Sequence, residues 1–242
     1  MDIAFESAAV QAKTTVGMTD VAPGRLVNST AQAMQARLDT HRSKFCTAAE
    51  ASAGLCSASQ LPGGDTNAAL LFDAAPAGSL QTKARYAYIQ HVLGAHDQKL
   101  EKSAGGTPAG EAFMVVKNRK DALLSVPAYS LAMIDAANTQ SAQFGGKSPN
   151  EVLKLRVNQY FGGKEAEQWS GSMARQTQRG LLVEAAKMAG LEVWIHHKQY
   201  EQNQRLEANL AALLLASADK LSGPLEAQYQ KVLADTANVT VK

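Results

Sequence analysis

The sequence predicts an all-α protein: an elongated helical bundle with one or two very long C-terminal helices and a disulfide-closed loop in its N-terminal part. Residues 164–221 contain no proline, which allows helix to continue for a long distance. Hydrophobic residues make up 45% of the chain but aromatic residues only 6%, and alanine fills many apolar positions, which favours closely packed helices over sheets. The only two cysteines are ten residues apart.

The chain divides into a short weakly patterned segment and one longer domain. Residues 1–28 show little periodicity and are predicted to form a flexible N-terminal segment. Residues 29–242 show no internal repeat and no sharp shift in composition, so we expect a single elongated helical domain. A chain of 242 residues is long enough to bury a core without help from a metal.

The first half of the domain is predicted to alternate short helices with loops. Ser29 and Gln32 have the spacing of a capping box, and apolar residues then recur at helical intervals, which predicts a helix over about 29–49. Glycines and a proline between 52 and 66 predict a loop, followed by a short helical turn over 67–72. Ser79 is a cap for a helix that runs to Leu93.

The middle of the chain contains a predicted mobile loop and two further helices. Residues 95–110 hold three glycines and a proline among charges, which predicts the loop. Helical periodicity returns over 113–143, where Pro127 should bend the helix or start a new one. A serine cap at Ser148, with a proline and a glutamate after it, predicts a short helix that ends at Gly162.

The proline-free stretch over 164–221 is the dominant feature of the sequence. A single helix of this length would extend on the order of 80 Å. That exceeds the diameter of a compact domain of this size, so either the protein is elongated or the chain folds back near Gly190. Ser222, Gly223 and Pro224 are predicted to end the stretch and to open a last helix through about 234.

Charge and hydropathy argue against two classes of partner. The net charge is +2 and both signs are dispersed along the chain, so no basic stripe is present to neutralise a run of phosphates, and we expect no direct nucleic-acid binding. The longest apolar run, residues 210–216, is much shorter than the roughly 18 residues of a membrane span. We therefore expect no transmembrane segment.

Cys46 and Cys56 are predicted to form a disulfide around a loop of small residues. The alternatives are two reduced thiols or, with less support, a zinc site, for which His41 is a poor match in spacing. A disulfide indicates an oxidising compartment, and the residues after Met1 lack the basic start and apolar core of a leader. We expect a protein of the periplasm or cell surface whose signal peptide has been removed.

No residue pattern indicates a catalytic, cofactor or metal site. Adjacent His196 and His197 point about 100° apart on a helix and cannot share an ion in the usual helical manner. The glycine pairs lack the strand and the lysine of a phosphate loop, and Gly171-Ser172 lacks the context of a nucleophile elbow. We predict a non-enzymatic protein.

Three residues of the long stretch are candidates for a partner surface: Trp194, Tyr200 and Arg205. Aromatic and arginine side chains are enriched at the energetically important centres of interfaces. Core packing is the alternative interpretation for aromatic residues at these helical positions.

Two passages together resemble a known class of proteins. They are the cysteine loop from Phe45 to Cys56 with the following Leu61-Pro62-Gly63-Gly64-Asp65, and the segment from Arg179 to Ala208 with Trp194, Tyr200 and Arg205. They resemble periplasmic accessory proteins of conjugative type IV secretion systems, of the kind that integrative elements and conjugative plasmids encode. The resemblance implies a helical, exported, non-enzymatic subunit that binds other secretion or pilus proteins.

Two functions of other classes stay open on the sequence alone. A periplasmic helical-bundle sensor or ligand-binding module would need a concave apolar pocket with convergent polar groups. A glycan hydrolase would need a cleft that holds two close carboxylates.

Overall fold

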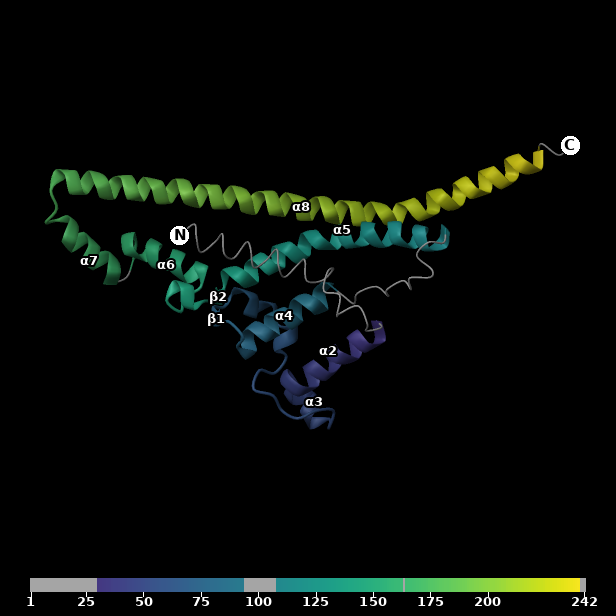
Figure 1. The fold of residues 1–242 in the computed structure, drawn as a ribbon, viewed down its shortest axis with the longest axis horizontal. Helices are drawn as coiled ribbons and strands as arrows, with labels where there is room; N and C mark the ends of the chain where they lie inside the picture. Colours follow the sequence, from purple (N-terminus) through teal and green to yellow (C-terminus); the bar gives the residue numbers. More distant parts are fainter. Residues whose placement is uncertain (1–29, 94–107, 163, 240–242) are drawn as a thin grey trace.

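A computed structural model describes residues 30–93, 108–162 and 164–239. These residues are mostly helical and form an elongated molecule, which confirms the predicted fold class (Figure 1). The predicted flexible segment 1–28 lies outside the described residues, as does most of the predicted mobile loop over 95–110. The helices are α2 (Thr30–Lys44), α3 (Ala48–Ser52), α4 (Leu80–Leu93), α5 (Pro108–Ala137), α6 (Pro149–Tyr160), α7 (Lys164–Met173) and α8 (Gln178–Val239).

Helix α8 has 62 residues and runs along one edge of the molecule (Figure 1). At 1.5 Å per residue it extends roughly 93 Å. The chain does turn within the proline-free stretch, but after Met173 and not near Gly190, which lies inside α8. Thr177 caps the new helix by accepting a hydrogen bond from the Gly180 amide at 3.2 Å. A glycine inside a helix lowers the helix's stability by only about 1 kcal/mol relative to alanine, and it keeps the amide hydrogen that the helix needs. Helix α8 therefore continues through Gly190.

The predicted end of this helix at residues 222–224 was wrong, because α8 continues to Val239. A proline removes one backbone hydrogen bond and crowds the preceding turn, but a long helix can accommodate it by bending. Pro127 is accommodated in the same way inside α5, so no new helix begins there.

The predicted helix over 29–49 is two helices. Helix α2 ends at Lys44, and Thr47 then forms a capping box with Glu50 that begins α3. Phe45 and Cys46 at the break are fully buried. A strong local capping signal inside a helical pattern therefore starts a new helix and redirects the chain.

Short elements connect the helices. Two 3₁₀ turns, η2 (Gly64–Thr66) and η3 (Ala68–Phe72), precede β1 (Ala75–Pro76), which pairs in parallel with β2 (Thr139–Gln140), and η4 (Ala142–Phe144) follows. The predicted turn over 67–72 is η3, and Ser79 and Ser148 cap α4 and α6 as predicted. The predicted helix over 113–143 ends early, because residues after Ala137 form β2.

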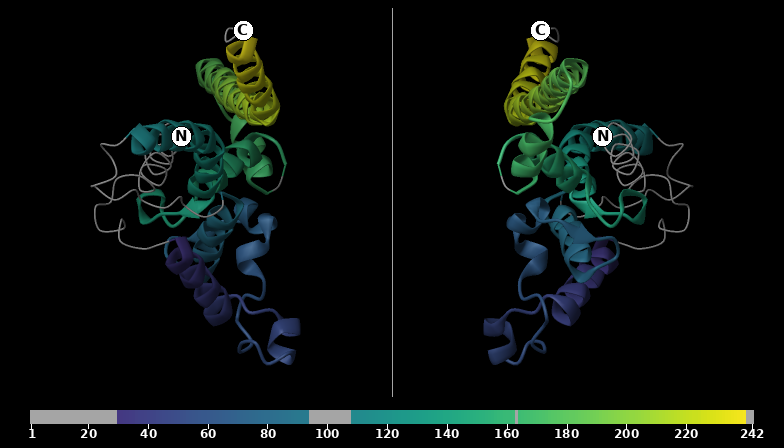
Figure 2. Two further views of the ribbon diagram at one scale, coloured as in Figure 1. Left: turned by 90° about the vertical axis from the view of Figure 1, so that its right-hand side faces the viewer. Right: turned by 90° about the vertical axis from the view of Figure 1, so that its left-hand side faces the viewer.

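The described residues place α8 at one side of the molecule and a small head at the other. The head comprises α2, α3, η2, η3 and α4, and its core contains Phe45, Leu70, Ala84 and Ala87. End-on views show α8 and the head on opposite sides, with α5 between them (Figure 2). Helix α5 packs against both, and its buried residues include Ala128, Ala132 and Ala136, which share one side of the helix. Within the described ranges, no helix is long and apolar enough to cross a membrane.

Candidate functional site: the disulfide-closed head and the outer face of helix α8

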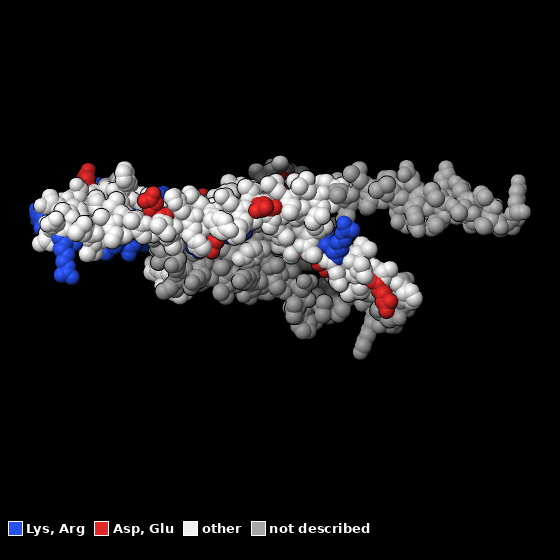
Figure 3. Space-filling model, turned by 90° about the horizontal axis from the view of Figure 1, so that it is seen from above, with Lys and Arg blue, Asp and Glu red and all other residues white. Residues whose placement is uncertain are grey.

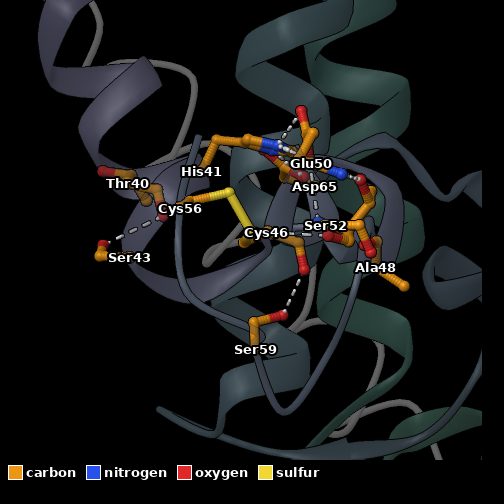
Figure 4. Close-up of a disulfide and its surroundings, with 11 residues drawn as sticks. Thr40, His41, Ser43, Cys46, Ala48, Glu50, Ser52, Cys56, Ser59 and Asp65 are labelled. Atoms are coloured by element: carbon orange, nitrogen blue, oxygen red, sulfur yellow. Dashed lines mark hydrogen bonds and ion pairs between the residues drawn. A yellow bond between two sulfur atoms is a disulfide. The ribbon is translucent and has the colours of Figure 1, made fainter. Parts of the chain in front are cut away.

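The predicted disulfide between Cys46 and Cys56 is present (Figure 4). It joins the end of α2 to the loop after α3, with the two Cα atoms 6.1 Å apart, within the range usual for disulfides. Ser59 donates a hydrogen bond to the Cys46 carbonyl at 3.1 Å and holds the loop beyond the bridge. The head therefore has a covalent closure where its hydrophobic core is small.

The glycine pair after the cysteine loop places a carboxylate inside the head. Gly63 has a φ of 65°, a left-handed conformation that favours glycine. A Cβ on Gly64 would lie 2.8 Å from Leu61 and 3.2 Å from Ala84, so only glycine lets this turn approach α4 so closely. The turn leads directly to Asp65, whose side chain is only 1% exposed.

Two histidines and two carboxylates meet beside the disulfide, and we call these four residues the His–Asp cluster: His41, Glu50, Asp65 and His91. The Nδ1 atom of His41 lies 2.9 Å from Asp65, and its Nε2 atom lies 2.9 Å from Glu50 (Figure 4). The Nε2 atom of His91 lies 3.2 Å from the same Asp65 carboxylate. The cluster thus joins α2, α3, η2 and α4.

The arrangement favours a protonated His41. A neutral imidazole has only one N–H, so both ring nitrogens can donate to carboxylates only when the ring carries its second proton. Burial alone lowers the pKa of His41, but hydrogen bonds to Glu50 and Asp65 and their negative charges outweigh it and raise the pKa above 6.5. Hydrogen bonds from Thr47, with a further one from His41, lower the pKa of Glu50 to about 2.

The cluster should make the stability of the protein depend on pH. A raised histidine pKa stabilises the fold below the histidine's ordinary pKa of 6.5, and this contribution is lost as pH rises through the raised value. The lowered pKa of Glu50 stabilises the fold above 4.5 and is lost towards pH 2. We expect the free energy of unfolding in urea to be greatest between pH 4.5 and 6.5 and to fall as pH rises above 6.5.

The control for this prediction is a matched pair of histidine variants. His41→Gln should remove most of the decrease above pH 6.5, whereas His197→Gln, at an exposed position of α8, should retain it. An unchanged pH profile in His41→Gln would show that the cluster does not govern this dependence.

In the disulfide-bonded head, the residues around Cys46 and Cys56 are poor ligands for a metal ion. The two cysteine sulfurs and a Glu50 oxygen lie within 4.8 Å of one another, but sulfurs in a disulfide are not the thiolates that bind metals. His41 uses both ring nitrogens for carboxylates. The contacts of His41 and Glu50 instead hold α2, α3 and η2 together.

A buried arginine connects the head to α5. Arg85 on α4 is fully buried, and its Nε atom lies 2.7 Å from the Asp135 carboxylate. Its guanidinium also donates to the Asp73 carbonyl at 2.7 Å and to the Thr139 hydroxyl at 2.7 Å. Burial raises the pKa of Asp135, although Arg85 opposes this shift. Arg85 thus fixes the β1–β2 junction to α4 and α5.

Helix α8 has an unusual distribution of polarity around its axis. Many residues that it half buries are polar, and Asn209 donates a hydrogen bond to Ser130 of α5 at 2.7 Å. At 100° per residue, the half-buried positions share one side of the helix. They include Glu184, Met188, Leu191, Trp194, Ile195, Lys198, Glu201, Arg205 and Asn209.

The opposite side of α8 carries what we call the outer row, eleven exposed residues at alternating spacings of four and three. They are Leu182, Ala186, Ala189, Val193, His196, Tyr200, Asn203, Glu207, Leu210, Leu214 and Ser217. Val193 is 69% exposed and Leu214 is 70% exposed, and Leu206 and Leu213 flank the row. Seen from above, this part of the surface is largely uncharged, with isolated ionic side chains (Figure 3).

The three predicted partner-surface residues do not share one face. Tyr200 lies in the outer row and is 60% exposed. Trp194 and Arg205 are half buried on the other side of α8, and Lys198 lies 5.8 Å from the centre of the Trp194 ring. Of the three, Tyr200 is the one on the exposed side of α8, where another protein could cover it.

Sequence reasoning missed both the His–Asp cluster and the outer row. The cluster joins positions up to 50 residues apart in the sequence. Its one local signal is the Gly63-Gly64-Asp65 turn, which fixes the position of a carboxylate. The outer row has a 4–3 spacing from Leu182 onwards. In the sequence, however, its residues are interleaved with apolar residues of the inner side of α8, which hides this spacing. Separating the two sides of the helix reveals it.

Comparisons of the chain with protein-family models, with curated proteins and with solved structures give no match.

Proposed function

We propose that this chain is a non-enzymatic interaction subunit that binds another helix along the outer row of α8, and that it serves a conjugative type IV secretion apparatus or its pilus in the periplasm or at the cell surface. The observation that carries the binding role is the outer row itself. Exposed apolar side chains gather at both ends of the row, with Leu182 and Val193 at one end and Leu210 and Leu214 at the other. Exposed apolar patches of this kind mark surfaces that bind other molecules. A 4–3 spacing is the spacing at which one helix packs against another in a coiled coil.

The disulfide supports the location. Structural disulfides form and persist in oxidising compartments such as the bacterial periplasm. The Cys46–Cys56 bridge is consistent with an exported protein, and it closes the head where the hydrophobic core is small.

Two hollows on the described surface give little support to a small-molecule function. Both are open and lined largely by polar side chains, which differs from the enclosed apolar pocket of a ligand-binding module. One is lined by Gln176, Thr177, Arg179, Gly180, Val183 and Glu184, and the other by Leu155, Gln159, Glu165, Gln168, Trp169 and Ser172.

A conjugation assay tests the proposal. In donor cells that lack this gene, complementation with Val193→Glu/Leu210→Glu should restore transfer at least about tenfold less well than the wild type, because buried carboxylates disrupt an apolar interface. The matched control is Gln199→Glu/Gln202→Glu, which adds the same charge to exposed positions of α8 outside the outer row. It should transfer normally.

Each variant must accumulate in the periplasm with its disulfide and with wild-type helicity, measured by circular dichroism. Normal transfer with the outer-row variant would contradict the binding role. Normal transfer in cells without the gene would contradict the link to conjugation.

A further inference from the structure

We infer that the helix bound by the outer row is α8 of a second copy, in antiparallel orientation, about a two-fold axis between residues 201 and 202. This inference rests on the proposed function and specifies its partner. Isologous contacts of this kind close after two subunits. It follows from how the row's residues would face one another.

The outer row is self-complementary in only one direction. Two residues face each other in an antiparallel pair when their numbers add to a constant, and with the axis between 201 and 202 that constant is 403. Glu207 of one copy then faces His196 of the other, so the two ionisable residues of the row meet as a hydrogen-bond donor and a carboxylate acceptor, twice in the dimer. In a parallel pair in register, Glu207 would face Glu207, and like charges at a coiled-coil seam are destabilising.

The sizes of the apolar residues match in the same register. Val193 faces Leu210 and the large Leu214 faces the small Ala189, so the large apolar residues of the row face apolar residues of the other copy. Tyr200 and Asn203 face each other near the axis. Between Ala189 and Leu214 of this alignment, polar residues thus face polar residues and apolar residues face apolar ones.

The length and the position of the row suit such a dimer. The paired segment from Ala186 to Ser217 covers about 48 Å at 1.5 Å per residue, comparable with the coiled-coil interfaces of stable dimers. The head lies on the opposite side of the molecule from α8, so two copies joined along the outer row keep their heads apart (Figure 2). No rearrangement of the described helices is needed.

Cysteine cross-linking in the full chain tests the orientation. The chain has only two cysteines and both are in the native disulfide, so introduced cysteines are the only free thiols. On mild oxidation, Val193→Cys/Leu210→Cys should give a covalent dimer, whereas Val193→Cys alone should not. Gln202→Cys, on a different side of α8, is the control and should stay monomeric on a non-reducing gel.

A charge swap tests the register. His196→Glu alone and Glu207→Lys alone should each weaken the dimer about tenfold in sedimentation equilibrium. The first places two carboxylates opposite each other, and the second replaces the carboxylate that accepts from His196 by a cation that cannot accept a hydrogen bond. The double variant, which exchanges the two charges, should recover most of the affinity. Independent losses with no recovery would overturn the pairing of these residues.

The outcomes separate this inference from the proposed function. A covalent dimer with Val193→Cys alone indicates parallel pairing and overturns the antiparallel arrangement. If the Val193→Cys variant is a monomer in sedimentation equilibrium and its introduced thiol reacts with maleimide, while outer-row variants still lose transfer, self-pairing is overturned but binding to another protein is retained. A monomer whose introduced thiol is protected from maleimide shows that a segment of the same chain covers the row and overturns self-pairing. A dimer whose disruption leaves transfer unchanged contradicts the proposed function and retains the pairing.

Discussion

Replacing Arg85 by methionine should lower the free energy of unfolding by about 3–5 kcal/mol, because breaking a buried ion pair leaves an uncompensated charge in the interior. The guanidinium of Arg85 is fully buried and contacts Asp135, Asp73 and Thr139. Urea denaturation at neutral pH measures this loss. The loss should be smaller at acidic pH, because a protonated Asp135 is neutral and is not left as an unpaired buried charge.

The double variant Arg85→Met/Asp135→Leu is the control for this prediction. Removing both charges leaves no lone carboxylate, so it should recover a substantial part of the stability lost in Arg85→Met alone. If Arg85→Met lowers the free energy of unfolding by less than about 1 kcal/mol, the arginine contributes little to the junction of the head and α5.

Removing the disulfide should have the second largest effect on stability. Cys46→Ser/Cys56→Ser should lose about 2–3 kcal/mol, because an open loop gives the unfolded chain more conformational freedom. The His–Asp cluster beside the bridge should loosen as well, since Glu50 lies within the loop that the disulfide closes. Urea denaturation of the variant, monitored by circular dichroism, measures the loss.

Wild-type protein treated with a thiol reductant is the matched control, because it opens the same loop without changing a residue. It should reproduce the stability of the double variant within the error of the measurement. Equal stability of oxidised and reduced wild type would show that the native contacts of the head suffice to hold the loop.

Local signals in the sequence predicted most of the secondary structure. Ser148 and Glu151 form the predicted capping box, and the spacing of Cys46 and Cys56 was enough to predict their bridge. The errors also have local causes. The Thr47 cap divided a predicted helix, and α8 accommodated Pro224 where a helix end was expected.

The candidate sites depend on contacts that sequence spacing does not encode. His41 meets Asp65 across 24 residues, and Arg85 meets Thr139 across 54, so neither could be found without the fold. The outer row is different, because its 4–3 spacing is present in the sequence. It became recognisable only when burial separated its members from residues such as Trp194 on the inner side.

The alanines of α5 have a consequence for how the molecule transmits force. Helix α5 packs against both the head and α8, and three residues on one of its sides, Ala128, Ala132 and Ala136, are buried and small. The distance between packed helices depends on the side chains at their contact. A pull along α8 would therefore reach the disulfide-closed head through α5, and the small alanines on one side of α5 keep one of its two contacts short.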